Sequence, residues 1–264
     1  MRTMAVISDP REDGAALTTT VPLVDDPPLG KVGVPRLLIV EDHPLFRAAL
    51  IGVIGSEFPD AEVLQATSID GALDVIASRD GLDLILLDLS MPGTTGLLGA
   101  YRVRAAAPRS ALVIVSAHDD PRIVGGAISL GISGYIPKST PKVELARLLR
   151  GILEGAVCLP TRFRDTAAAR KSQAETRELV QQLGQFTAQQ LRVLDMICHG
   201  LQNKHIAYQL AISVTTVKVH VSEILRKLGV RSRTEAIIAL SKLDFGKHDH
   251  APVTAPRSAH GIES

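Results

Sequence analysis

The stretch LILLDLSMPG, residues 84–93, decides how the first half of the chain folds. Its apolar run predicts a strand that is covered on both faces, as in a parallel sheet flanked by helices. Asp88 then falls at the carboxyl end of this strand, where open α/β sheets place their ligand sites. A carboxylate that only caps the next turn is the simpler interpretation of a single such residue. The rest of the chain has to decide between the two.

Five strand patterns alternate with helical patterns over residues 35–157. The segments RLLIV, AEVLQAT, LDLILLDL, ALVIVSA and GYIPK have the apolar character of strands, and a helical spacing of apolar residues follows each of them. Such an alternation predicts an α/β fold with a doubly wound five-stranded parallel sheet.

Composition limits the classes of protein that fit. The chain has 264 residues, 45% of them hydrophobic, which is enough for two domains. Between Phe186 and Leu243, eight Lys or Arg stand against three Asp or Glu, a net charge of +5 that favours a polyanionic partner. Cys158 and Cys198 lie far apart and lack the spacing of a metal site. Such sparse cysteines fit a protein of a reducing compartment better than a disulfide-linked one. Without an apolar run of membrane length or a signal-peptide pattern, we expect a soluble cytoplasmic protein.

The same patterns divide the chain into five parts. We expect a disordered leader over residues 1–34, the α/β domain over 35–157 and a partly helical linker over 158–184. A small all-α domain is expected over 185–243 and a disordered tail over 244–264.

Chemically useful side chains follow four of the predicted strands. Glu41 and Asp42 follow the first strand and Asp88 ends the third, which is its neighbour in a doubly wound sheet. Three converging carboxylates repel one another unless a cation lies among them, and oxygen ligands suit Mg²⁺. Ser116 and Lys138 follow the fourth and fifth strands, where a hydroxyl and an ammonium can contact a phosphoryl group.

The basic segment predicts four short helices and no strand. Thr187 and Gln190 fit a capping box, and Ser213 can cap a helix that begins near Thr215. A short helix, a tight turn and this longer helix have the geometry of a helix-turn-helix. The longer helix carries an apolar stripe made of Val217, Val221, Ile224, Leu225 and Leu228.

The opposite face of that helix carries Thr215, Val219, Ser222 and Arg226. An exposed valine between hydroxyls and cations suits the major groove of DNA, where a methyl group contacts thymine and lysine contacts guanine or phosphate. The alternative is a helical dimerisation or docking bundle whose charges are only solvated.

The segments VEDHPLFR, LILLDLSMPGTTG, LVIVSAHDD and GYIPKS resemble the receiver domain of two-component response regulators, over residues 35–157. The resemblance implies a flavodoxin-like fold in which Asp88 is the phosphoacceptor and Lys138 the partner of the phosphoryl group. It makes Ser116 and Tyr135 the switch. It also implies that Mg²⁺ is held by Glu41, Asp42, Asp88 and the backbone carbonyl of Ser90. One position departs from the family, because Ser139 stands where a proline with a cis bond is usual. A cis bond before another residue costs about 3 kcal/mol, so this bond is either trans or strained.

The segment SVTTVKVHVSEILRKLGVRSRTEA, residues 213–236, resembles the LuxR-type helix-turn-helix of the NarL/FixJ branch. The resemblance places Lys218, Val219 and Ser222 on base edges and makes Thr216, Lys204 and His220 backbone contacts, although His220 can equally be a core residue. Departures from the family are Gln189, Gln190 and His205, where Arg, Glu and Glu are common.

Together these features predict a DNA-binding response regulator. A sensor histidine kinase is expected to phosphorylate Asp88, and the switch then controls homodimerisation and promoter binding, without enzymatic turnover beyond slow self-dephosphorylation. A Mg²⁺-dependent phosphatase or phosphotransferase is the enzyme alternative, but Ser90 stands where such enzymes carry a second acid. The third possibility is a phosphorylation-independent transcription factor whose receiver is a docking module.

Overall fold

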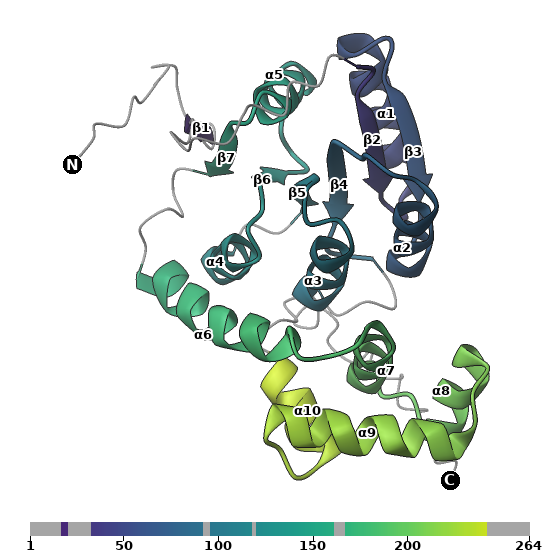
Figure 1. Ribbon diagram of the computed structural model, residues 1–264. Helices are drawn as coiled ribbons and strands as arrows, with labels where there is room; N and C mark the ends of the chain where they lie inside the picture. Colours follow the sequence, from purple (N-terminus) through teal and green to yellow (C-terminus); the bar gives the residue numbers. More distant parts are fainter. Residues whose placement is uncertain (1–16, 21–32, 92–95, 118–119, 161–166, 242–264) are drawn as a thin grey trace, which may run out of the picture.

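The computed structural model describes residues 17–20, 33–91, 96–117, 120–160 and 167–241. Its α/β part is built on a seven-stranded sheet in the order β1-β7-β6-β5-β4-β2-β3, and all neighbours are parallel except β1 and β7 (Figure 1). The strands are β1 (Leu17–Thr20), β2 (Arg36–Val40), β3 (Glu62–Ala66), β4 (Leu84–Asp88), β5 (Ala111–Ser116), β6 (Gly134–Pro137) and β7 (Val157–Pro160). The five predicted strands are β2 to β6, so the predicted doubly wound parallel sheet is confirmed.

The sheet is wider than predicted at one edge. β7 lies beyond β6, and Leu17–Thr20 pair with Pro160–Val157 as the antiparallel strand β1. The prediction of a disordered leader over 1–34 is therefore wrong for these four residues. Without β1, the edge of β7 would expose unpaired backbone groups, so a further strand can pair there. The run of β-branched threonines favours an extended chain for that strand. The remaining leader residues 1–16 and 21–32, and all of the predicted tail 244–264, lie outside the described residues.

Helices cover both faces of the sheet. On one face α1 (Pro44–Glu57) and α5 (Lys142–Leu153) pack against β-strand side chains such as Leu37 and Val113. On the other face lie α2 (Ile69–Ser78), α3 (Gly96–Ala106) and α4 (Pro121–Ser129), packed on side chains such as Leu38 and Ile114. β4 is buried along its whole length, as its apolar run predicts.

The second half of the chain is helical. The linker helix α6 (Ala167–Leu183) precedes α7 (Ala188–Cys198), α8 (Asn203–Leu210), α9 (Val214–Leu228) and α10 (Arg233–Leu240). α6 packs along α4, and α7 packs against α3 (Figure 1). The apolar cluster on the α3 and α4 face of the sheet continues through these contacts into the core of the helical domain.

Local signals place the helices as the sequence predicts. The Thr187 side chain accepts a hydrogen bond from the Gln190 amide at 3.2 Å, and the Gln190 side chain accepts one from the Thr187 amide at 3.1 Å, so the capping box is confirmed. Ser213 caps α9 by accepting from the Thr216 amide at 3.0 Å. In the turn between α8 and α9, Ala211 has a φ of 52°, a left-handed conformation that is uncommon for alanine. No helix among the described residues has the length and apolarity needed to cross a membrane.

Candidate phosphoacceptor site and DNA-reading helix

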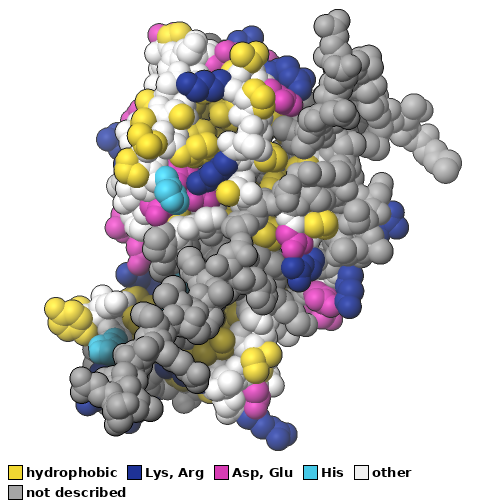
Figure 2. All heavy atoms as spheres, turned by 180° about the vertical axis from the view of Figure 1, so that it is seen from behind, with side chains coloured by type: hydrophobic (Ala, Val, Ile, Leu, Met, Phe, Trp, Pro, Cys, Tyr) yellow, Lys and Arg dark blue, Asp and Glu magenta, His cyan; other side chains and the backbone are white. Residues whose placement is uncertain are grey.

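Three acidic residues converge at the carboxyl edge of the sheet. Glu41 directly follows β2, Asp88 ends β4, and both side chains are buried, while Asp42 is half-buried. One ligand atom from each of Glu41, Asp42, His43 and Asp88 lies within 4.8 Å of the others. The predicted acids are thus brought together, because β2 and β4 are parallel neighbours. Figure 2 shows acidic, basic and histidine side chains gathered on one face of the larger lobe.

Lys138 neutralises part of this cluster. Its Nζ lies 2.7 Å from Glu41 Oε2 and 2.9 Å from Asp88 Oδ2. Burial opposes the charged amine, but the hydrogen bonds and charges of Glu41 and Asp88 outweigh it and raise the pKa of Lys138 above its ordinary value. The side chain is therefore an ammonium at neutral pH. The ring of Phe46 also lies 4.7 Å from Nζ, which adds a cation–π contact.

His43 belongs to the cluster and was missed in the sequence interpretation. Its backbone amide donates to Glu41 Oε1 at 3.0 Å, and its ring Nδ1 lies 3.1 Å from the same oxygen and 3.0 Å from Asp42 Oδ1. The only signal in the sequence is its position directly after two acids, which does not reveal that the ring turns back toward them.

The peptide bond between Lys138 and Ser139 is trans, as are all the bonds of the described segments. The two possibilities left by the missing proline are thereby reduced to one. The Lys138 amide donates to the Ser116 carbonyl at 2.8 Å, and the side chain still reaches both acids. The departure at Ser139 therefore leaves Lys138 at the site.

The other predicted receiver residues lie at or near the same edge. Ser90 is exposed, and its amide donates to Asp88 Oδ1 at 3.0 Å. Ser116 ends β5 and is buried. Tyr135 on β6 is completely buried, so its ring already points inward in this structure. Their roles as metal ligand and switch stay predictions.

The predicted DNA contacts lie on α9 and α8. Thr216, Lys218, Val219 and Ser222 are exposed on α9, and Lys204 is exposed on α8. Val219 keeps 57% of its surface exposed, although its side chain is apolar.

His220 is half-buried, so burial does not decide between its two interpretations. Of the predicted stripe, Val217, Ile224 and Leu228 are buried, and Val221 and Leu225 are half-buried. At the departing positions, Gln190 is buried and its Oε1 accepts from Lys227 Nζ at 2.7 Å, while His205 is exposed.

A doubly wound sheet with acids at its carboxyl edge, joined to a helix-turn-helix domain, defines the class of DNA-binding response regulators. The family model of the response regulator receiver domain matches residues 37–150, and that of bacterial regulatory proteins of the luxR family matches residues 184–240.

Similar proteins agree. The glycerol metabolism activator of Pseudomonas putida is 44% identical over 213 residues, which cover 80% of this chain and 96% of that protein. The nitrate/nitrite response regulator protein NarL of Escherichia coli (strain K12) is 34% identical over 205 residues, covering 76% and 93% of the two chains. A solved structure of the response regulator ChrA of a heme-sensing two-component system is 28% identical, covers 80% of this chain and 98% of that chain, and has a TM-score of 0.37. The chain belongs to the NarL/FixJ-type response regulators, which are DNA-binding regulators of transcription in two-component systems.

Proposed function

We propose that Asp88 of this response regulator receives a phosphoryl group from a sensor histidine kinase, with Mg²⁺ held by Glu41, Asp42, Asp88 and the Ser90 carbonyl. The observation that carries the proposal is the convergence of three carboxylates on one lysine at the edge where β2 and β4 end. The donor set is mostly carboxylate oxygen, which fits a hard divalent cation. When bound, Mg²⁺ neutralises charge on the carboxylates and on the phosphoryl oxygens.

The chain's own residues prepare the transfer. An Asp88 carboxylate oxygen attacks the phosphorus, the bond from phosphorus to the kinase histidine nitrogen breaks, and an acyl phosphate forms on Asp88. Both Asp88 oxygens already have a donor, Ser90 N–H on Oδ1 and Lys138 on Oδ2, so the carboxylate is oriented before the donor arrives. The Lys138 ammonium can follow the charge onto the phosphoryl group, and the Ser116 hydroxyl can bond one of its oxygens.

The output of the switch is transcription control in the cytoplasm. Phosphorylation of Asp88 favours homodimers, in which the two DNA-binding domains bind the half-sites of a promoter together. The protein is a phosphoryl acceptor with slow self-dephosphorylation and not an enzyme with turnover. Since one relative is named a glycerol metabolism activator, promoters of glycerol metabolism genes are the first DNA to test.

Intact-protein mass spectrometry after incubation with acetyl phosphate and MgCl₂ tests the proposal. We expect a single phosphoryl adduct on the wild type, none on Asp88→Asn, and the wild-type result on the control Asp74→Asn, which removes an exposed acid of α2. No adduct on the folded wild type would move the function to a phosphorylation-independent transcription factor whose receiver is a docking module.

A further inference from the structure

The helical domain is docked on the receiver through an extensive seam. α7 lies between α3 of the receiver and α9, and α6 packs along α4 (Figure 1). Buried residues of α6 and α7, among them Leu183 and Leu194, belong to the same apolar cluster as Leu97 and Val103 of α3. The two domains therefore share one core at this seam.

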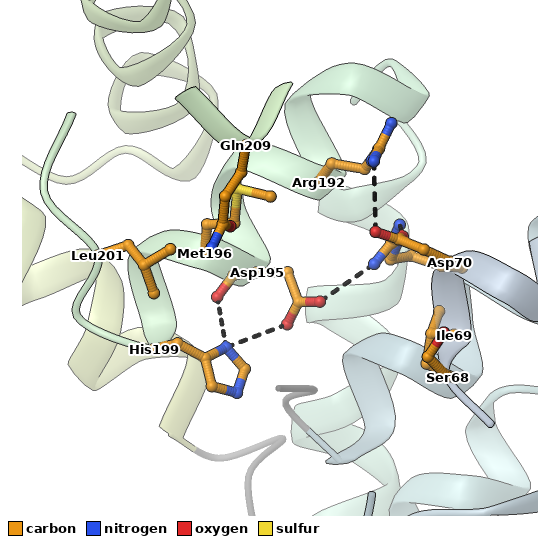
Figure 3. A pocket seen from close by; sticks show the side chains of 10 residues that line it. Ser68, Ile69, Asp70, Arg192, Asp195, Met196, His199, Leu201 and Gln209 are labelled. Atoms are coloured by element: carbon orange, nitrogen blue, oxygen red, sulfur yellow. Dashed lines mark hydrogen bonds and ion pairs between the residues drawn. The ribbon is translucent and has the colours of Figure 1, made fainter. Parts of the chain in front are cut away.

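A buried ion pair crosses the seam. Arg102 on α3 has only 5% of its side chain exposed and Asp195 on α7 only 6%, and Arg102 Nη1 lies 3.1 Å from Asp195 Oδ2. Nη2 of Arg102 pairs with Asp70 of α2. Arg192 of α7 reaches the same Asp70 at 3.3 Å (Figure 3). Two receiver helices and one helix of the DNA-binding domain are thus joined by four charged groups.

This pair specifies how the domains fit. Sliding α7 along α3 would leave the buried Asp195 carboxylate without its Arg102 partner, and the cost of that buried charge opposes the movement. An apolar seam alone tolerates small shifts, whereas the paired charges of Arg102 and Asp195 match in one register only. His199 extends the network, because its Nδ1 bonds the Asp195 carbonyl at 2.8 Å (Figure 3).

The docked orientation leaves the DNA-reading face of α9 outward. α7 separates α9 from the receiver, and the exposed side of α9 carries Lys218, Val219 and Ser222. The main contacts with the receiver are those of α6 with α4 and of α7 with α3, on the other side of the domain (Figure 1). Among the described residues, none of the predicted base contacts is buried by the receiver.

We propose that the docked arrangement is itself competent to bind DNA, and that Arg102 is the positioning residue that holds the DNA-binding domain in it through Asp195. Each chain presents its reading helix whether or not it is phosphorylated. On the proposed phosphorylation of Asp88, the regulated step is then the pairing of two chains, and not the uncovering of α9.

A covalent clamp tests whether docking and DNA binding are compatible. Asp70 and Arg192 face each other across the seam with 48% and 39% of their side chains exposed, beside a pocket of about 330 Å³ that opens to solvent. In the full-length Asp70→Cys, Arg192→Cys variant, a short bismaleimide joins the two introduced thiols. The native Cys158 and Cys198 are buried and therefore shielded from the reagent. Its binding to a fluorescent 30-base-pair duplex of random sequence at low salt is compared with that of the same variant blocked with N-ethylmaleimide.

We expect the clamped and unclamped chains to bind the duplex with affinities within about twofold of each other. A loss of tenfold or more on clamping would overturn the proposal, because it would mean that α9 reaches DNA only after undocking. The unphosphorylated chain is used throughout, so the result is independent of whether Asp88 accepts a phosphoryl group.

A second experiment tests Arg102 as the residue that holds the seam. Hydrogen exchange of the full chain should rise in α3 and α7 for Asp195→Asn and for Arg102→Leu, with duplex affinity still within about twofold of wild type. The control Glu57→Gln breaks the α1–α5 ion pair with Arg150, within the receiver, and should leave exchange in α3 and α7 unchanged.

If a single variant is too unstable to measure, the double variant Arg102→Leu, Asp195→Leu removes both charges at once and keeps an apolar seam. Unchanged exchange in both single variants would contradict the role given to Arg102. A tenfold gain in affinity on release would instead contradict the proposal that the docked arrangement is competent to bind DNA.

Discussion

Lys138 Nζ bridges Glu41 Oε2 at 2.7 Å and Asp88 Oδ2 at 2.9 Å, so one ammonium joins acids at the carboxyl ends of two neighbouring strands. Without a divalent cation, this ammonium is the positive charge that offsets the repulsion between the two buried carboxylates. The folded receiver therefore depends on Lys138 most when Mg²⁺ is absent.

Lys138→Met is expected to lower the free energy of unfolding by about 2 kcal/mol in Mg²⁺-free buffer, below the range for fully buried pairs because the Lys138 side chain is 16% exposed. Added MgCl₂ should recover much of the loss, since it can take the place of the ammonium among the carboxylates. Urea unfolding with and without MgCl₂ measures both effects. The control Lys142→Met removes an exposed lysine and should match the wild type. Equal stability of Lys138→Met and wild type without Mg²⁺ would contradict the bridging role.

Gly126 lies on α4 where this helix packs against the linker helix α6. A Cβ at this position would overlap the buried Leu97 side chain and lie 3.2 Å from Thr176 Oγ1 on α6. Gly126→Ala should destabilise the protein by about 1–2 kcal/mol despite the better helix propensity of alanine. Gly52 in α1 has no atom within 4 Å of its Cβ position, so Gly52→Ala should be neutral or stabilise by up to about 1 kcal/mol. Thermal unfolding of the two variants in parallel separates the effect of crowding from that of propensity.

The sequence predicted most of the receiver because its signals are local. The apolar run before Asp88 and the alternation of strands and helices place β2 to β6, and parallel pairing brings Glu41 and Asp88 together. β7 has only four residues and β1 is a polar strand in the leader, so neither has a pattern that stands out from a loop. The capping residues Thr187 and Ser213 were equally readable, since a cap acts within three residues.

The seam between the domains could not be predicted in the same way. Arg102 stands between Tyr101 and Val103 on a helix that also carries Arg104, and an arginine on a helix is usually a solvated surface residue. In the sequence, Asp195 is only one of the three acids in the net charge of residues 186–243. Their pairing joins residues 93 positions apart and depends on how the two domains dock, which no local pattern records.

Glu223 is the one acidic residue in the sequence of α9. It pairs with Arg226 at 2.8 Å, and this guanidinium holds the pKa of Glu223 below its ordinary value, so the carboxylate is charged at neutral pH. Glu223→Gln should therefore raise affinity for a random-sequence duplex by a few-fold at low salt, because repulsion from phosphate is lost and Arg226 is released. Fluorescence anisotropy across a salt series measures this effect. Asp74→Asn makes the same change of charge on α2 of the receiver and should leave affinity unchanged.

Val219 and Lys218 should affect DNA binding in different ways. Val219→Ser keeps an exposed position small but replaces the methyl groups that can contact thymine, so preference at one base pair should fall by about 1 kcal/mol while affinity for random DNA stays the same. Lys218→Met removes a charge and should weaken binding to all sequences. Sequencing of the duplexes bound from a random pool, together with anisotropy on the unselected pool, distinguishes the two effects. A uniform loss in Val219→Ser with an unchanged base preference would show that this valine only packs against the DNA backbone.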